Sequence, residues 1–250
     1  MSIEYAAAAG VARITLNRPD KRNAITGEMM SALRDALERA AGDSAVRILL
    51  IRGAGKDFCA GLDLSEVLKS AEDAGASLAS ARRLGDLYIA MRRHPKPIVA
   101  AVHGRALGGG AGIATASDLI LAAESAQFGY PEVKLGFIPA IVFTMLQRAV
   151  NERQAMELAL TGEPLSASRA YAIGLINRVY PDAEFNAQAD RYVAALAEQS
   201  ATATSLSKTL LYQTDGLSFE SSIEAGVQAN VQVRQTADFK RGVERFLKKN

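Results

Sequence analysis

Short apolar runs that alternate with helical patterns constrain the fold of this chain more than any other feature. Such runs occupy residues 48–51, 97–102 and 118–122. Continuous apolar runs of this length are typical of strands that are buried on both faces. A helical pattern at 26–42, with Thr26 as N-cap and Gly42 as stop, separates a half-buried strand at 11–16 from the first run, and another helix begins at Gly110. Strands joined by helical crossovers pair in parallel, so the sequence predicts an α/β fold.

The chain changes character after Pro181, where only helical patterns remain. These patterns cover residues 185–198, 201–212, 219–233 and 237–246. Each carries an apolar stripe, which needs a partner surface on this chain or on another subunit. No linker or repeat is visible before about residue 180. We therefore expect a core domain at 1–195 and a C-terminal helical oligomerisation region at 196–250.

Composition excludes several classes of protein. With 250 residues and 49% apolar content, the chain can bury a large core, and its net charge of +2 is too small to indicate nucleic-acid binding. The start of the chain lacks a basic segment followed by an apolar run, and the weakly polar stretch 106–123 contains several glycines and Asp118, so we expect a cytoplasmic protein without membrane association. Cys59 is the only cysteine, which excludes a thiolate metal cluster. Cys59 and the isolated histidines His94 and His103 are expected to be structural.

Two glycine turns, at 58–64 and 104–112, each follow a predicted buried strand. In the second turn, consecutive glycines precede a helix, so a ligand can approach bare backbone N–H groups that the helix dipole makes favourable for anions. No Gly-Lys-Ser/Thr follows, and Thr115 breaks the dinucleotide-binding spacing. Taken alone, such glycines are more often a device for close packing against a neighbouring backbone than a catalytic element.

The order of these turns, together with the segment Phe128-Gly-Tyr-Pro-Glu-Val-Lys-Leu-Gly-Phe-Ile-Pro, resembles the enoyl-CoA hydratase/isomerase (crotonase) family. Further matching segments lie at 16–19, 160–162, 170–179 and 246–249. The resemblance implies a crotonase-like (ClpP/crotonase) spiral of repeated ββα turns with a C-terminal α-helical trimerisation region. It also implies a homotrimer or a dimer of trimers, and a place in fatty acid metabolism.

The resemblance assigns three catalytic residues. It implies that the N–H groups of Leu62 and Gly109 form an oxyanion hole for a thioester carbonyl, and that Glu132 is the catalytic glutamate. The residues around this glutamate are apolar: Gly129, Val133, Leu135 and Phe137. We expect these neighbours to desolvate its carboxyl group and to favour the neutral form. Without the resemblance, an exposed glutamate at a helix start would be the simpler interpretation.

The resemblance also assigns substrate-binding residues. At the CoA nucleotide end it implies Lys21, Arg22 and Ala24, with Phe246 and Lys249 contributed by a neighbouring subunit. Around the glycine turns and the glutamate it implies Ala60, Gly61, Asp63, Gly108, Gly112 and Pro131. Asp63 is expected to order its own turn through backbone N–H groups. The acyl pocket is expected to use Leu68, Leu84, Leu87, Ile141 and Phe143. No metal is implied, and no cofactor beyond the CoA moiety of an acyl-CoA substrate.

Gly112 leaves the reaction open, because the two-glutamate hydratases of the family carry their second glutamate at this position. A single carboxylate can move a proton between C4 and C2 of an enoyl chain, and it can also activate a water and return that water's proton to the same face. The pattern around Gly112 resembles family members that hydrate branched glutaconyl-CoA thioesters. We therefore expect an enoyl-CoA hydratase that adds water syn to a 2-enoyl-CoA. The alternatives are a single-glutamate Δ3-Δ2-enoyl-CoA isomerase and a catalytically inert acyl-CoA-binding homologue.

Overall fold

The computed structural model describes residues 1–248 and is built around a six-stranded sheet. Its strands, in spatial order, are β1 (Ile3–Ala8), β2 (Val11–Leu16), β3 (Ile48–Gly53), β4 (Ile98–Val102), β6 (Leu119–Ala123) and β9 (Arg178–Tyr180). The β1–β2 pair is an antiparallel hairpin that turns at Ala9 and Gly10, both with positive φ, and the four pairs that follow are parallel. A smaller sheet contains β5 (Arg105–Leu107), β7 (Gln127–Gly129) and β8 (Leu165–Ser166).

The predicted strands and the first predicted helix are confirmed. The runs at 48–51, 97–102 and 118–122 become β3, β4 and β6, and β4 is buried throughout. Helix α1 (Gly27–Gly42) begins after Thr26, whose hydroxyl oxygen accepts a hydrogen bond from the Met29 N–H at 3.1 Å. This bond satisfies one of the free N–H groups of the first turn. Strand β1 was not predicted, because its residues show no apolar alternation and it depends on pairing with β2.

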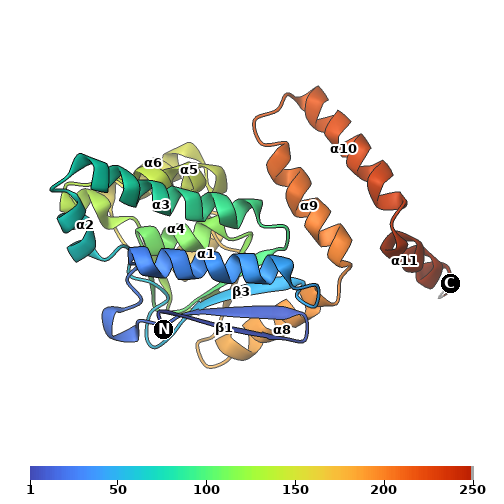
Figure 1. The fold of residues 1–250 in the computed structure, drawn as a ribbon, viewed down its shortest axis with the longest axis horizontal. Coiled ribbons are helices and arrows are strands. Elements are labelled where there is room, and N and C mark those ends of the chain that lie inside the picture. Colours follow the sequence, from blue (N-terminus) through green and yellow to red (C-terminus); the bar gives the residue numbers. More distant parts are fainter. Residues whose placement is uncertain (249–250) are drawn as a thin grey trace.

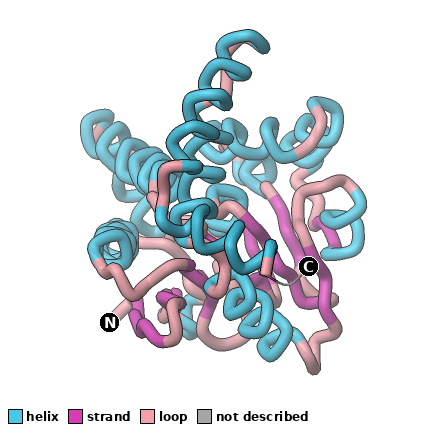
Figure 2. The backbone as a smooth tube through the Cα atoms, turned by 90° about the vertical axis from the view of Figure 1, so that its right-hand side faces the viewer, coloured by secondary structure: helices cyan, strands magenta, loops and turns pink. Residues whose placement is uncertain are grey.

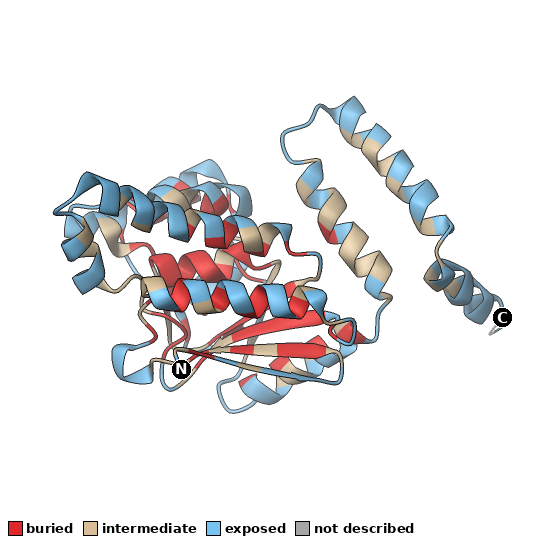
Figure 3. Ribbon diagram, viewed as in Figure 1, coloured by how far each residue is buried: buried red, intermediate tan, exposed pale blue. Residues whose placement is uncertain are grey.

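Helices cover both faces of the large sheet (Figure 1). On one side lie α1, α3 (Ala74–Arg93) and α4 (Gly109–Ala116), and on the other side α8 (Phe185–Ala197) contacts β2, β3 and β6. The body is completed by α2 (Leu64–Ser70), α5 (Ala140–Ala149), α6 (Glu152–Thr161), α7 (Ala167–Ala172) and the 3-10 turns η1 (Pro19–Lys21) and η2 (Pro131–Leu135). Figure 2 shows the strands packed among these helices, and Figure 3 shows that the buried residues concentrate in the sheet, in α4 and on one side of α1.

The last three helices lie to one side of this body, with α9 in contact with α3 and the other two farther out (Figure 1). They are α9 (Ala201–Gln213), α10 (Phe219–Arg234) and α11 (Ala237–Leu247), so the predicted C-terminal helices are confirmed. Lys208 of α9 is buried, and its ammonium group lies 2.9 Å from an Asp118 carboxylate oxygen and donates to the Met91 carbonyl at 3.0 Å. In contrast, the apolar stripe of α10 is exposed on this chain: Phe219, Ile223, Val227 and Val231. The oligomerisation role of residues 196–250 stays a prediction.

The isolated cysteine and histidines have structural environments, as predicted. Cys59 is fully buried, and burial raises the pKa of its thiol to about 12. His94 is buried between the carbonyl groups of Leu37 and Lys96, and His103 contacts the Gly55 carbonyl at 3.0 Å. Within residues 1–248, no helix has both the length and the apolar character that a membrane crossing requires. The same residues contain no group of three or more His, Cys, Asp or Glu side chains that could hold a metal ion.

Candidate active site

The two glycine turns lie side by side. The segment that leads into the first turn runs along β5, where the Cys59 N–H donates to the Arg105 carbonyl at 2.9 Å and the Cys59 carbonyl accepts from the Leu107 N–H at 3.0 Å. Helix α4 then packs so closely on this segment that a Cβ at Gly110 would overlap the Cys59 carbonyl oxygen. At the turn itself, a Cβ at Gly61 would lie 3.8 Å from the Gly109 nitrogen. The backbones of two turns that are far apart in sequence therefore lie next to each other.

Leu62 and Gly109 each present an unused N–H group. Leu62 forms a parallel bridge with Ile25, in which the Gly61 carbonyl accepts from the Ile25 N–H and the Asp63 N–H donates to the Ile25 carbonyl. These bonds use the groups on either side of Leu62 and leave its own N–H free. Gly109 is the first residue of α4, where an N–H has no acceptor within the helix. Within residues 1–248 neither N–H has a hydrogen-bond acceptor, and both residues line one cleft.

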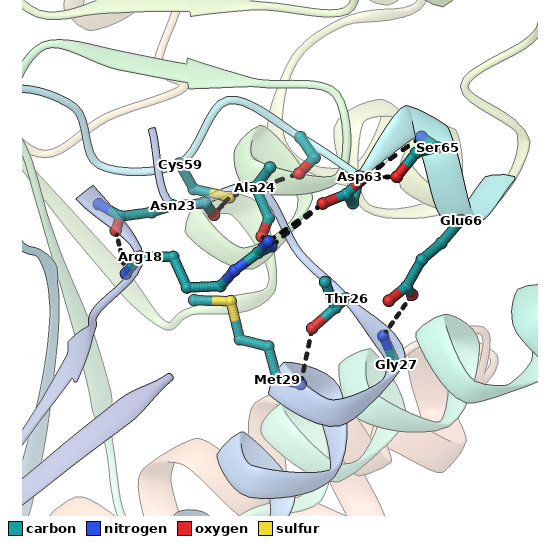
Figure 4. Close-up of polar contacts among 11 residues, drawn as sticks. Arg18, Asn23, Ala24, Thr26, Gly27, Met29, Cys59, Asp63, Ser65 and Glu66 are labelled. Atoms are coloured by element: carbon teal, nitrogen blue, oxygen red, sulfur yellow. Dashed lines mark hydrogen bonds and ion pairs between the residues drawn. The ribbon is translucent and has the colours of Figure 1, made fainter. Parts of the chain in front are cut away.

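A polar network fixes the first turn (Figure 4). The Arg18 guanidinium donates to the Ala24 carbonyl at 2.5 Å and to an Asp63 carboxylate oxygen at 3.2 Å. The other Asp63 oxygen accepts from the Ser65 N–H at 3.2 Å and from the Ser65 hydroxyl at 2.5 Å. The Ser65 hydroxyl and Arg18 lower the pKa of Asp63, which keeps this carboxylate charged. The prediction that Asp63 orders its own turn is confirmed.

Glu132 lies in η2, directly after Pro131, with its carboxyl group against the second glycine turn. Gly108 has a φ of +49°, and a Cβ at this residue would lie 3.1 Å from the Glu132 Oε1 atom. Glycine therefore serves two purposes here, because it adopts a positive φ and lets the carboxyl group approach the backbone. The Glu132 Oε2 atom is buried and has no hydrogen-bond partner within residues 1–248.

Burial raises the pKa of Glu132, which confirms the predicted direction. The source of the desolvation differs in part from the prediction. Leu135 and Phe137 line the cleft but are 61% and 52% exposed, and Val133 is exposed and does not line it. Much of the enclosure instead comes from residues distant in sequence, such as Leu62 and Gly108, which line the same cleft. Neighbours in sequence are a poor guide to burial in a 3-10 turn, because three residues per turn point consecutive side chains in different directions.

The cleft has two parts that meet at this carboxyl group. The outer cleft, about 370 Å³, carries Lys21, and the inner pocket, about 380 Å³, extends between α2, α3 and α5. The residues common to both are Leu62, Val67, Gly109, Glu132 and Phe137. The predicted site residues that line the outer cleft are Lys21, Ala24, Ala60, Gly61, Leu62, Asp63, Gly108, Gly109, Pro131 and Glu132. Val67 was missed, because nothing in the pattern of α2 distinguishes it from neighbouring apolar residues.

Three predicted binding residues do not line this cleft. Arg22 is exposed outside it, and its carbonyl instead accepts the Ala60 N–H at 3.0 Å. Gly112 is buried in α4, where the Tyr88 side chain occupies the adjacent space. Phe246 is 67% exposed on α11, away from the cleft of its own chain, so its assignment to a neighbouring subunit's site stays a prediction. Lys249 lies outside the described residues.

The acyl-pocket prediction is correct for Leu84 and Ile141, which line the inner pocket. It is wrong for the other three residues. Leu68 is 73% exposed, Leu87 is fully buried in the core, and Phe143 lines a separate surface depression. Helical spacing identifies an apolar face, but the packing of α2, α3 and α5 decides which residues on that face reach the pocket.

A larger cavity, of about 560 Å³, lies between α9 and the body, but it is built differently from the cleft. Its two arginines, Arg92 and Arg148, both donate to the same carboxylate oxygen of Asp215. The described residues do not bring free backbone N–H groups and an unpartnered carboxyl group together there. The chemistry therefore points to the cleft at Glu132.

Comparisons with known proteins agree with this geometry. The sequence profile of the enoyl-CoA hydratase/isomerase family matches residues 6–250. A Thermus thermophilus protein that carries the name enoyl-CoA hydratase is 39% identical over 96% of this chain and 95% of its own length. The 1,2-epoxyphenylacetyl-CoA isomerase of Escherichia coli is 34% identical over 96% of this chain and 93% of its own length.

The fold comparison gives the same result. The crystal structure of an enoyl-CoA hydratase from Mycobacterium smegmatis superposes with a TM-score of 0.96 at 29% identity, over 100% of this chain and 97% of that one. The predicted crotonase-like α/β fold with C-terminal helices is thereby confirmed. The chain is an enzyme that belongs to the enoyl-CoA hydratase/isomerase family.

Proposed function

We propose that this enzyme adds water to a 2-enoyl-CoA to give a 3-hydroxyacyl-CoA. One observation carries the proposal: the outer cleft and the inner pocket meet where Leu62, Gly109 and Glu132 converge. An acyl chain in the inner pocket and a CoA moiety in the outer cleft, which carries Lys21, would place the thioester carbonyl at this junction. Pockets of a few hundred Å³ with a few convergent polar groups are typical of small-molecule sites.

The backbone would stabilise the charge that develops during the reaction. With the thioester oxygen at the junction, the Leu62 and Gly109 N–H groups would donate to it as it becomes an enolate oxygen. Neither group has another acceptor within residues 1–248, so no bond has to break first. Removing one such donor typically costs 10²–10³-fold in turnover, or about 3–4 kcal/mol.

Glu132 would carry both proton transfers. Its carboxylate takes a proton from a water molecule as the water oxygen bonds to C3. The electron pair of the C2–C3 double bond forms the C1–C2 double bond of the enolate, and the carbonyl electron pair moves onto the thioester oxygen. The protonated Glu132 then gives that proton to C2, the enolate collapses, and one water has been added to one face. The raised pKa suits this cycle, because it makes the carboxylate a stronger base and makes its protonated form easier to reach.

The inner pocket favours a neutral acyl chain over a glutaconyl chain. Among the described residues that line it, Glu132 is the charged one, and neither lysine nor arginine is present. A terminal carboxylate would therefore lose its hydration without gaining a cation, next to a group of the same charge. Crotonyl-CoA is the simplest substrate that fits these properties.

Isomerisation is the second candidate, because the described cleft offers a single free carboxyl group. Asp63 also lines it, but Arg18 and Ser65 already bond its carboxylate. Glu132 alone could take a proton from C2 of a 3-enoyl-CoA and return it to C4. The similarity to the Escherichia coli isomerase supports keeping this candidate.

Incubation with crotonyl-CoA, a 3-enoyl-CoA and 3-methylglutaconyl-CoA separates the hypotheses. We expect crotonyl-CoA to gain the mass of one water and to lose its conjugated absorbance. A 3-enoyl-CoA that gains conjugation without a change in mass would identify an isomerase, and binding without a product from any thioester would identify an inert homologue.

Gly109→Pro, which removes one N–H donor, should lower turnover about 10²–10³-fold in an assembled protein. A fully active Gly109→Pro variant would contradict the oxyanion assignment.

The exposed stripe of α10 supports a homo-oligomeric enzyme, as a homotrimer or a dimer of trimers. Phe219, Ile223, Val227 and Val231 would be covered by other copies, which would also bring Phe246 and Lys249 to a neighbour's outer cleft. Sedimentation of the purified protein tests this assembly, and a monomer at micromolar concentration would exclude it.

The proposed chemistry uses two backbone N–H groups and one carboxyl group, so it needs no cofactor beyond the CoA of the substrate.

A further inference from the structure

The Tyr88 hydroxyl occupies the space that a side chain at residue 112 would need. A Cβ built on Gly112 would overlap the Tyr88 hydroxyl oxygen, and would lie 2.6 Å from its Cζ atom and 3.0 Å from a methyl group of Val142. Tyr88 extends from α3 and is 4% exposed, so it cannot swing into solvent without disturbing the core. The Tyr88 side chain can therefore occupy this position only because residue 112 has no side chain.

The same hydroxyl donates a hydrogen bond to the Gly109 carbonyl at 2.8 Å. Gly109 and its neighbours Gly108 and Gly110 have no side chains, so the position of this stretch depends on contacts and hydrogen bonds of its backbone. The Tyr88 bond is buried and ties the first turn of α4 to α3. Burial also raises the pKa of Tyr88 well above its usual value, which favours the protonated hydroxyl that acts as the donor.

We propose that Tyr88 is a positioning residue, which holds Gly109 in the orientation in which its N–H reaches the thioester oxygen. The inference rests on the oxyanion role proposed above for Gly109. Tyr88 does not line either part of the cleft, so it acts through the backbone and not by touching the substrate. The absence of a side chain at Gly112 then has a positive function, because it makes room for the hydroxyl that sets the oxyanion hole.

Tyr88→Phe tests the proposal, because it removes the hydroxyl and keeps the ring that fills the core. Loss of a whole oxyanion donor costs 10²–10³-fold, and loss of its support should cost less, so we expect turnover of crotonyl-CoA to fall about tenfold with KM unchanged. The sharper readout is the carbonyl ¹³C resonance of bound butyryl-CoA labelled at C1. Donors that polarise the carbonyl shift this resonance, and in Tyr88→Phe it should move toward the value of the free thioester.

Tyr5→Phe is the matched control, since the Tyr5 hydroxyl in β1 is buried and has no hydrogen-bond partner within residues 1–248. It should leave both turnover and the carbonyl resonance unchanged. Gly112→Ala should reproduce the Tyr88→Phe defect by displacing the hydroxyl. If both variants act through one hydrogen bond, the double variant should be no slower than the slower single variant.

Three results would overturn the proposal. Tyr88→Phe could retain the wild-type carbonyl resonance and turnover, it could lose thermal stability without moving the resonance, or its effect could multiply with that of Gly112→Ala. The proposed function fails separately: the wild-type protein would then neither hydrate crotonyl-CoA nor shift the butyryl-CoA carbonyl, and the role of Tyr88 would fall with it.

Discussion

Replacing Glu132 with glutamine should remove activity and stabilise the fold at the same time. The Glu132 Oε2 atom is buried without a hydrogen-bond partner among the described residues, and burial raises the pKa of this carboxyl group. The site therefore disfavours the charged form of the carboxyl group. The same property makes the carboxylate a stronger base. Glutamine has nearly the same shape and no charge, so it removes the proton transfer and the cost together.

The magnitude follows from the burial of this group. The glutamine amide is still polar, so the substitution removes only the cost of burying the charge: an unsatisfied buried polar group costs about 1–3 kcal/mol, and a charged group costs more. Glu132 lines an open cleft where solvent screens part of its charge, so we expect the lower end of that range, about 1 kcal/mol. In a chain of 250 residues this corresponds to about 2–4 °C in Tm. Turnover should fall at least ~10²-fold, because a positioned general base contributes that much or more.

The gain in stability should depend on pH in one direction. Because the pKa of Glu132 is higher in the folded state, the protonated form favours folding, and this contribution is lost as the pH rises through the folded pKa. Wild type and Glu132→Gln should therefore have similar Tm values near pH 4, where the carboxyl group is largely protonated. The variant should become the more stable protein as the pH increases toward 8.

Calorimetry of both proteins from about pH 4 to pH 8, with the hydration assay at each pH, measures both effects. Glu72→Gln is the matched control, because Glu72 is exposed between α2 and α3, and its Tm difference should stay near zero. Equal Tm values for wild type and Glu132→Gln at pH 8 would refute the reasoning. So would a gain of the same size at every pH, which would show that charge is not the cause.

Three further perturbations test other parts of the structure. Gly108→Ala would force a positive φ on alanine and place its Cβ 3.1 Å from Glu132, so urea unfolding should show a loss of about 1–3 kcal/mol and hydration should slow; unchanged stability would contradict the close approach. Lys208→Met would leave the Asp118 carboxylate without its buried cation, and calorimetry should show a loss of about 3–5 kcal/mol; a loss below 1 kcal/mol would show that the pair is dispensable. The Cys59 thiol, whose pKa is raised to about 12, should react with iodoacetamide ~10³-fold more slowly in the folded than in the urea-unfolded protein, and comparable rates would contradict its burial.

Much of this protein could be predicted from local sequence. The buried strand β3 and the helix α1 are specified by apolar spacing and by the Thr26 cap, which act over a few residues. The two glycine turns and the Pro131-Glu132 pair were also recognisable in order along the chain, which located the lining of the outer cleft. The strand and the helix were predictable because neighbouring residues dictate their backbone geometry, whereas the roles of Leu62, Gly109 and Glu132 were assigned through the family resemblance.

Tertiary structure alone decided how these pieces act together. Leu87 faces the core and Leu68 faces solvent, although both lie on apolar helix faces, because the depth of a side chain depends on how helices pack. The contact between Tyr88 and Gly112 joins two helices and could not be inferred from either segment. The elevated pKa of Glu132 likewise depends on cleft residues from turns that are distant in sequence, such as Leu62 and Gly108. The desolvation of a group and its close contacts depend on all the residues that surround it in space. In this fold many of those residues are remote in sequence.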